Sequence, residues 1–140
     1  MDSVLVAENS VTDQITALVV DDSRPARELI TNYLHQSGFH VLTAGSGDEA
    51  VEKISTCKPN IIILDVVLPG RSGFELCREL KETSETMNIP IILCSKKATS
   101  VDRFWGLRQG ANAYLTKPFG REEFIQTVRQ CLGGKSDMEI

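Results

Sequence analysis

The chain has 140 residues, of which 41% are hydrophobic and 24% are charged, and its formal net charge is −4. These values are ordinary for one globular domain with a single core, and they exclude a disordered chain. No apolar run approaches the roughly 18 residues of a membrane span, and lysines and arginines do not cluster, which excludes a membrane-spanning protein and a nucleic-acid-binding surface.

After a polar leader, strand-like and helix-like patterns alternate five times along the chain. Short apolar or β-branched runs are typical of buried strands, and longer segments with helical periodicity begin at a capping residue and end near glycine or proline. The predicted strands are Thr16–Val20, His40–Ala44, Ile61–Leu64, Ile91–Cys94 and Ala113–Leu115. The predicted helices lie between Ser23 and Gly38, between Ser46 and Pro59, from Gly73 onward, over Thr99–Gln109 and over Arg121–Leu132.

Strands that alternate with helices predict right-handed βαβ units. The fold class is therefore α/β, with a five-stranded parallel sheet covered on both faces by five helices. We expect one domain over residues 16–134, a flexible leader over 1–15 and a short tail over 135–140. Ser46 and Glu49 have the spacing of a capping box, so we expect each side chain to accept a hydrogen bond from the other residue's backbone amide.

The four cysteines do not have the spacing of a metal site. Their surroundings are apolar, which favours buried thiols in a reducing cytoplasm over a zinc site. The start of the chain also lacks the basic segment of a signal peptide, so we expect a cytoplasmic location. The cysteines are Cys57, Cys77, Cys94 and Cys131.

Charged side chains follow three of the predicted strands. Asp21 and Asp22 come directly after the first strand, Asp65 after the third, and Lys117 shortly after the fifth. Parallel strands end at the same edge of a sheet, where α/β proteins bind their ligands, so we expect these side chains to converge. Three carboxylates repel one another unless a cation neutralises them. The arrangement therefore predicts a magnesium-dependent site at which an aspartate accepts phosphate.

Four pieces of sequence, in this order, resemble the response-regulator receiver domains of the CheY type over about residues 16–134. The pieces are Val19-Val20-Asp21-Asp22-Ser23, the run from Ile63 to Gly73, Ser95, and the run from Gly110 to Phe119. The separation of 22 residues between Ser95 and Lys117 also fits the family. The resemblance implies a flavodoxin-like, doubly wound sheet with strand order 2-1-3-4-5 and a cis peptide bond between Lys117 and Pro118.

The resemblance also implies a role for each residue of this edge. Asp65 would be the nucleophile that forms an aspartyl phosphate. Asp22, Asp65 and the backbone carbonyl of Val67 would ligate Mg²⁺ directly. Asp21 would act on the metal mainly through water, because Mg²⁺ keeps several of its waters. Lys117 would contact a phosphoryl oxygen or the free carboxylate of Asp65.

Two further residues would form a switch. The Ser95 hydroxyl would donate to the phosphoryl group, and Tyr114 would follow Ser95 inward, although Tyr114 could instead be ordinary strand packing. The surface formed by residues 99–109, 113–115 and 121–132 would then change and bind partners.

Two residues near the phosphate depart from the commonest family pattern. Lys96 is large, and it either narrows water access to the phosphate or points outward. Val67 is apolar and cannot position an attacking water, so we expect the phosphate to persist longer than in a fast chemotaxis regulator.

The fourth predicted helix contains the single tryptophan. Phe104 and Leu107 can face the sheet together, whereas Trp105 is turned about 100° from Phe104 around the helix. Trp105 is either an exposed binding anchor or partly buried against a neighbouring helix. The run from Trp105 to Gly110 resembles stand-alone regulators of pilus-based motility and phototaxis, the PilH kind.

We therefore predict a stand-alone response regulator, phosphorylated on Asp65 by a histidine kinase or phosphotransfer protein, that signals to an unidentified output protein. It would bind neither nucleic acid nor membrane, and it would turn over no substrate besides its own phosphate. One alternative is a phosphate sink that drains a kinase. A hydrolase of other substrates is disfavoured, because no substrate domain or extra general base is present. A receiver cut from a DNA-binding regulator is disfavoured by Met1 and by the short segment after Gly134.

Overall fold

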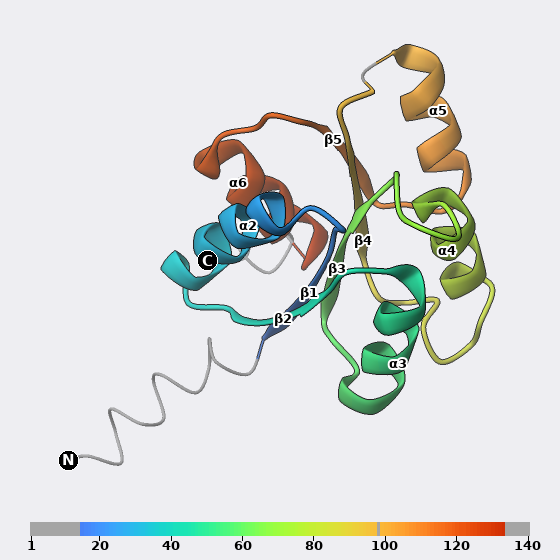
Figure 1. The fold of residues 1–140 in the computed structure, drawn as a ribbon, viewed down its shortest axis with the longest axis horizontal. Coiled ribbons are helices and arrows are strands. Elements are labelled where there is room, and N and C mark those ends of the chain that lie inside the picture. Colours follow the sequence, from blue (N-terminus) through green and yellow to red (C-terminus); the bar gives the residue numbers. More distant parts are fainter. Residues whose placement is uncertain (1–14, 98, 134–140) are drawn as a thin grey trace.

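The computed structural model describes residues 15–97 and 99–133, which form a five-stranded sheet and five helices (Figure 1). The elements are β1 (Thr16–Val20), α2 (Arg24–Gln36), β2 (His40–Ala44), α3 (Gly47–Cys57), β3 (Ile61–Asp65), α4 (Gly73–Lys81), β4 (Ile91–Ser95), α5 (Ser100–Arg108), β5 (Ala113–Thr116) and α6 (Arg121–Cys131). The strand order is β2-β1-β3-β4-β5 and every neighbouring pair is parallel, which confirms the predicted fold.

The predicted leader and tail lie outside the described residues, apart from Ile15. Of the helices that the structure describes, none has both the length and the apolar character needed to cross a bilayer.

Three strands are one residue longer than predicted. β3, β4 and β5 end at Asp65, Ser95 and Thr116. The parallel ladder continues there, because Asp65 lies opposite Cys94 and Ser95 lies opposite Thr116. Aspartate is a poor strand former and a polar residue ends an apolar run, so the sequence pattern stops too early. As a result, Asp65 and Ser95 are held by strand pairing rather than by a loop.

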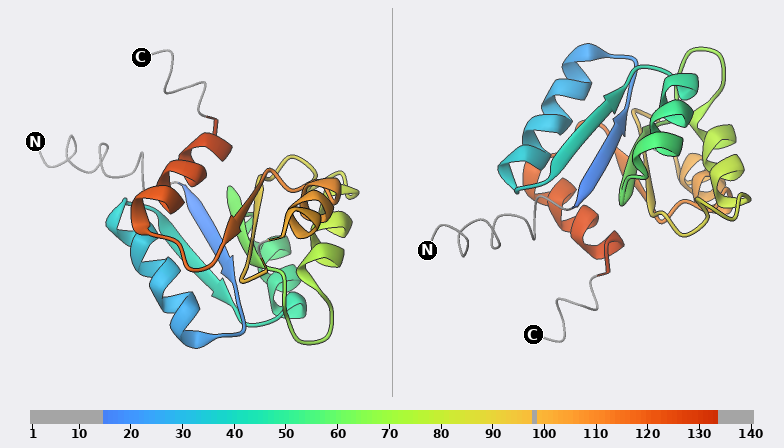
Figure 2. Two further views of the ribbon diagram at one scale, coloured as in Figure 1. Left: turned by 90° about the horizontal axis from the view of Figure 1, so that it is seen from above. Right: turned by 90° about the horizontal axis from the view of Figure 1, so that it is seen from below.

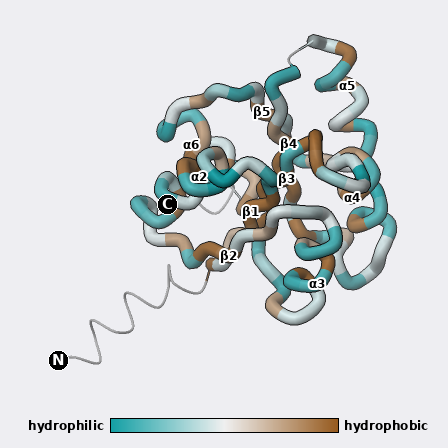
Figure 3. The backbone as a smooth tube through the Cα atoms, in the orientation of Figure 1, coloured by the Kyte–Doolittle hydropathy of each residue, from teal (hydrophilic) through white to brown (hydrophobic). Residues whose placement is uncertain are grey.

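Helices cover both faces of the sheet (Figures 1 and 2). α2 and α6 lie on one face, and α3, α4 and α5 lie on the other. Neighbouring residues of β1 point to opposite faces, so Ala17 and Val19 enter the core beneath α2 and α6, while Leu18 and Val20 enter the other core. Figure 3 shows apolar residues concentrated along the strands. The sheet is therefore a rigid platform, and its carboxyl edge carries the polar residues.

Side-chain caps set the first residue of four helices. A backbone amide in the first turn donates to the side chain of Ser23, Ser46, Ser72 and Thr99. The capping box predicted at α3 is only half formed. The Ser46 hydroxyl accepts from the Glu49 amide at 3.2 Å, but the Glu49 carboxylate accepts from the Gly45 amide at 2.8 Å. The prediction for Glu49 was wrong, because the Gly45 amide takes the carboxylate that would have bonded to Ser46.

The inner face of α5 also differs from the prediction. Phe104 and Leu107 do not face the sheet, since 57% and 51% of their surfaces are exposed. Gly106 is the buried residue of this helix. The ring of Tyr114 lies so close beneath it that a β-carbon on Gly106 would come within 2.6 Å of the ring. Tyr114 therefore fills the space that side chains of α5 were predicted to occupy.

The cysteine prediction holds only in part. Cys77 and Cys94 are buried and Cys131 is partly buried, but Cys57 is exposed. Cys57 is the last residue of α3 and is not among the buried residues of that helix, so the prediction was wrong for this residue. Burial raises the pKa of Cys77 to about 11, as expected for an unreactive structural thiol.

Candidate functional site

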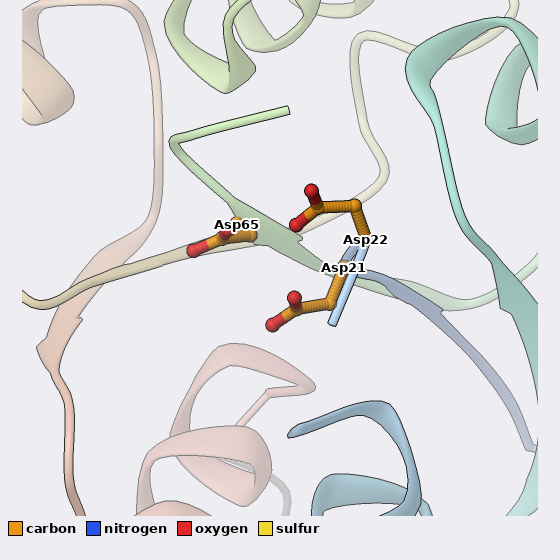
Figure 4. A group of neighbouring side chains, drawn as sticks. All are labelled: Asp21, Asp22 and Asp65. Carbon is orange, nitrogen blue, oxygen red and sulfur yellow. The ribbon is translucent and has the colours of Figure 1, made fainter. Parts of the chain in front are cut away.

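Three carboxylates meet at the carboxyl edge of the sheet (Figure 4). Asp21 and Asp22 directly follow β1, and Asp65 is the last residue of β3. One oxygen atom from each carboxylate lies within 4.8 Å of the other two. Asp21 and Asp65 are buried and Asp22 is exposed, so the cluster opens to solvent on one side. The three aspartates thus converge as predicted.

Lys117 joins this cluster from the end of β5. Its ammonium nitrogen lies 2.6 Å from Asp21 Oδ2 and 3.3 Å from Asp65 Oδ1, and only 16% of its side chain is exposed. Burial lowers the pKa of Lys117, but the hydrogen bond to Asp21 and the charge of Asp65 outweigh burial and raise that pKa above its usual range. Lys117 is therefore a fixed positive charge. The peptide bond that follows it, to Pro118, is cis, as the family resemblance implies.

Asp21 holds the cluster in place more than it offers free oxygens. Its Oδ1 accepts from the Ser23 amide at 2.9 Å, and its Oδ2 accepts from Lys117. Arg27 of α2 donates from Nη1 to the Asp21 backbone carbonyl at 2.8 Å. The contact with Arg27 could not be predicted from the sequence, because an arginine on a helix usually points into solvent, whereas Arg27 is half-buried here.

The pKa of the Asp65 carboxyl group departs strongly from its ordinary value. Burial, followed by the charge of Asp21, raises its pKa to about 6, and Lys117 opposes that rise. One ammonium group therefore compensates only part of the charge of three carboxylates. At neutral pH Asp65 is ionised and its charge is costly, and a second cation in the cluster would relieve that cost.

The excess of negative charge in this cluster bears on whether a magnesium ion fits here. Mg²⁺ prefers oxygen ligands, and it is commonly held by one or two carboxylates together with waters and phosphate oxygens. Asp22 is exposed and Asp65 faces it, so both can offer an oxygen from the open side. The charge and the donor atoms of the cluster both fit a divalent cation.

Ser95 lies at the end of β4, next to β5. It is 1% exposed, and its hydroxyl oxygen accepts from the Lys97 amide at 3.0 Å. Its backbone carbonyl accepts from the Lys117 amide at 2.9 Å. The strand pair therefore holds Ser95 and Lys117 together at this edge.

Tyr114 occupies an inward position beneath α5. It is 7% exposed, and its hydroxyl donates to the Lys97 carbonyl at 3.0 Å. Burial raises the pKa of Tyr114, and the nearby Ser95 side chain opposes this rise. The two residues predicted to form the switch are thus neighbours.

The loop after β3 brings the remaining predicted residues to the edge. Val67 follows Asp65 by two positions, and 59% of its surface is exposed. The loop returns at Gly73, whose amide donates to the Val66 carbonyl at 2.7 Å. A β-carbon on Gly73 would collide with the Asp65 carbonyl, so only glycine permits this approach. Lys96 is exposed, which favours the outward orientation over a barrier against water.

The outer face of α5 carries a group of exposed apolar side chains. Trp105 is 51% exposed and packs edge-on against Phe104 of its own helix, with 6.0 Å between ring centroids. Val101 is 61% exposed, and the Arg108 guanidinium lies 5.7 Å from the Phe104 ring centroid. About half of the Trp105 surface is therefore open to a partner, which supports the binding-anchor interpretation.

A five-stranded parallel sheet with an acidic cluster at its carboxyl edge is the arrangement of a receiver domain, and a family comparison supports this class. Residues 17–129 match the family of the response regulator receiver domain, so the chain belongs to that family. Receiver domains serve phosphorylation-based signalling in two-component systems and interact with histidine kinases and effector proteins. Their acidic site binds Mg²⁺, which the cluster of Asp21, Asp22 and Asp65 matches.

Individual relatives narrow the resemblance further. The chain is 38% identical over 117 residues to protein PilH of Pseudomonas aeruginosa, which covers 84% of this chain and 97% of PilH. A response-regulator crystal structure from Chloroflexus aurantiacus is 34% identical with a TM-score of 0.82, covering 84% of this chain and 97% of that one. The chemotaxis protein CheY4 of Vibrio cholerae is 30% identical with a TM-score of 0.79, covering 84% and 98%. These similarities confirm the resemblance to CheY-like regulators and to the PilH kind.

Proposed function

We propose that Asp65 accepts a phosphoryl group from a histidine kinase or phosphotransfer protein, and that the phosphorylated chain signals through protein contacts. The position of Asp65 carries this proposal. It is 8% exposed at the end of a central strand, beside two other carboxylates, and 3.3 Å from the Lys117 ammonium. A carboxylate oxygen held there can attack phosphorus in line while positive charge lies next to the transferred group.

The ligands that would hold Mg²⁺ are Asp22, Asp65 and the Val67 carbonyl. Asp21 would reach the ion through water, because one of its oxygens already accepts from Lys117 and the other from a backbone amide. When bound, the ion neutralises the carboxylates and withdraws charge from the phosphoryl oxygens.

Three side chains divide the work of the transfer. The Asp65 oxygen forms the new bond to phosphorus as the bond between phosphorus and its donor breaks. Lys117, already 3.3 Å from Asp65, balances the charge that the phosphoryl group brings. The Ser95 hydroxyl donates to a phosphoryl oxygen once the group is in place. Water would later hydrolyse the aspartyl phosphate, which releases inorganic phosphate and restores the Asp65 carboxylate. Apart from this transfer and hydrolysis, the chain would catalyse no reaction.

A hollow beside the site suits the phosphodonor protein. Its lining consists of Ala26, Leu29, Ile30, Lys96, Lys117, Pro118 and Phe119. A donor that reaches Asp65 must cover this edge, and Leu29, which is 48% exposed, offers apolar contact area there.

The output surface would be the face formed by α5, β5 and α6. This face gives a partner protein large exposed apolar side chains to bury, namely Val101, Phe104, Trp105 and Leu107. Tyr114 links this face to the phosphorylation site, because its hydroxyl bonds to the loop that follows Ser95.

Phosphorylation of the purified chain tests the assignment. With Mg²⁺ and acetyl phosphate, intact-mass analysis should detect one added phosphoryl group that base and hydroxylamine remove. Asp65→Asn should abolish the gain, because the amide is nearly isosteric but not nucleophilic. Asp48→Asn, at an exposed position of α3, is the matched control and should label normally. Labelling of the Asp65→Asn variant at another residue, to the same extent, would refute the assignment.

A further inference from the structure

Three groups enclose the side chain of Tyr114, and we call them the tyrosine seat: the Lys97 carbonyl, Gly106 and Arg103. The carbonyl accepts the Tyr114 hydroxyl at 3.0 Å and so fixes the far end of the side chain. The other two groups belong to α5, the helix whose outer face carries the exposed apolar residues. The position of the ring and the position of this helix are therefore coupled.

Gly106 provides the room for the ring. A β-carbon at this position would lie 2.6 Å from Tyr114 Cδ2, 3.0 Å from Cε2 and 3.2 Å from a methyl carbon of Leu93. The first contact is closer than real β-carbons tolerate, and Leu93 belongs to the buried strand β4, so neither neighbour can yield freely. Any larger residue at position 106 must push the ring out or lift α5 from the sheet.

Arg103 closes the seat one turn earlier on the same helix. Its guanidinium carbon lies 5.7 Å from the Tyr114 ring centroid, a favourable cation–π arrangement. Its Nη2 donates to Thr116 Oγ1 at 2.6 Å, and its Nη1 donates to the Tyr114 carbonyl at 3.4 Å. Arg103 thus ties α5 to β5 on either side of Leu115, directly before Lys117.

The glycine is costly for the helix that contains it. Glycine in the interior of a helix is less favourable than alanine, and α5 has only nine residues to stabilise it. A free choice at a buried helical position beside a sheet would be a larger apolar residue. The close approach of Tyr114 accounts for the small residue here.

We propose that Gly106 and Arg103 are positioning residues that favour the inward position of Tyr114 and thereby set how readily phosphorylation reshapes the face of α5, β5 and α6. The inference rests on the proposed function, because it takes Asp65 as the acceptor and Tyr114 as the switch. The inference adds that residues of α5 set the equilibrium between the inward and outward positions of Tyr114. A change in the seat alters the switch without touching the phosphorylation site.

Fluorine NMR can observe the seat directly, because the chain has two tyrosines, Tyr33 and Tyr114. In protein labelled with 3-fluorotyrosine, Tyr33→Phe assigns the two signals. With Mg²⁺ and saturating beryllofluoride, a phosphoryl mimic, the wild-type Tyr114 signal should show the small solvent isotope shift of a buried ring. Gly106→Ala should move this signal to the shift of an exposed ring. Gly120→Ala is the matched control, because a β-carbon at Gly120 meets nothing within 4 Å.

The affinity for beryllofluoride separates positioning from mere packing. A ligand that favours the inward state binds more weakly when that state is depopulated. Gly106→Ala should therefore raise the apparent dissociation constant of beryllofluoride about fivefold or more, within the usual range of coupling between sites. Arg103→Gln should raise it less. Both variants should bind Mg²⁺ alone as the wild type does, because neither residue touches the carboxylate cluster.

The outcomes separate the role of the tyrosine seat from the role of Asp65 as the phosphoryl acceptor. If the wild type binds the mimic but Gly106→Ala shows the same affinity and the same Tyr114 signal, the seat proposal is overturned and Asp65 keeps its role. If the wild type binds no beryllofluoride, the proposed function fails and the seat proposal fails with it. If Gly106→Ala does not fold, the Arg103→Gln variant tests the seat proposal instead, because this substitution removes only contacts of an exposed side chain. An unchanged Tyr114 signal and affinity in that variant would then overturn the proposal.

Discussion

Removing the charge of Asp65 should stabilise the protein when no metal is present. Asp65 is buried beside Asp21, and its pKa is raised to about 6 from an ordinary value of 3.8, even though Lys117 lies 3.3 Å away. The folded protein therefore disfavours the ionised form. Asp65→Asn replaces that form with a neutral side chain of nearly the same shape, so the variant should resemble the wild type with Asp65 protonated.

The magnitude follows from the difference between the folded and unfolded pKa. Between pH 3.8 and about 6, the folded state keeps a proton that the unfolded state has released, so the free energy of unfolding falls as the pH rises through this window. Above that window the wild type has lost about 2–3 kcal/mol, since one pKa unit corresponds to about 1.4 kcal/mol. At pH 7.5 in EDTA, Asp65→Asn should therefore melt on the order of 10 °C higher than the wild type.

Thermal melts at pH 4 and pH 7.5, with and without Mg²⁺, measure this effect. The gap between variant and wild type should be large at pH 7.5 in EDTA and small at pH 4, where most of the wild-type protein carries a neutral Asp65. Mg²⁺ should also narrow the gap at pH 7.5, because binding stabilises only the protein that keeps the ligand. A variant that is less stable than the wild type at pH 7.5 without metal, or a gap independent of pH, would refute the reasoning.

Two further predictions concern the metal and the output face. Asp22→Ala should weaken Mg²⁺ binding sharply by removing a direct ligand, while denaturant midpoints without metal should not fall, because one of three repelling carboxylates is gone; a clear loss of apo stability would contradict this. Adding beryllofluoride with Mg²⁺ should change the emission of Trp105, the single tryptophan. Asp65→Asn should abolish that change, Ser95→Ala should weaken it, and an unchanged wild-type spectrum despite confirmed binding would favour the phosphate sink.

The sequence predicted the sheet and its reactive edge because both depend on local signals. Short, β-branched apolar runs such as Ile61–Leu64 are typical of buried strands, and a polar residue at the end of the run marks the carboxyl edge. Asp21, Asp22 and Asp65 converge because parallel strands share that edge, which requires no knowledge of side-chain packing. Strand order is a different matter, because it depends on which strands pair, and here it came from family resemblance.

The prediction failed where one element's packing depends on a side chain from another. Helical spacing placed Phe104 and Leu107 on the inner face of α5, but Tyr114, from the following strand, occupies that space. The signal that could have warned of this is Gly106, because a glycine inside a helical pattern often marks a close approach. Arg103 left no comparable signal, since its contacts with Tyr114 and Thr116 depend on how α5 lies over β5.

The geometry explains how a chemical change on a rigid sheet can reach a helix. β4 and β5 are fixed by pairing, and the Ser95 carbonyl is bonded to the Lys117 amide, so these strands cannot move separately at the site. What can change is side-chain position: the Ser95 hydroxyl bonds within the loop that leads to α5, and the Tyr114 hydroxyl bonds to the same loop at Lys97. Under the proposed function, a phosphoryl group that draws the Ser95 hydroxyl away would release its bond to the Lys97 amide, and Tyr114, whose hydroxyl bonds to the Lys97 carbonyl, would respond. The helix that follows this loop is α5, which carries the exposed Phe104 and Trp105. The side chains that would change position therefore lie beside the surface that a partner would bind.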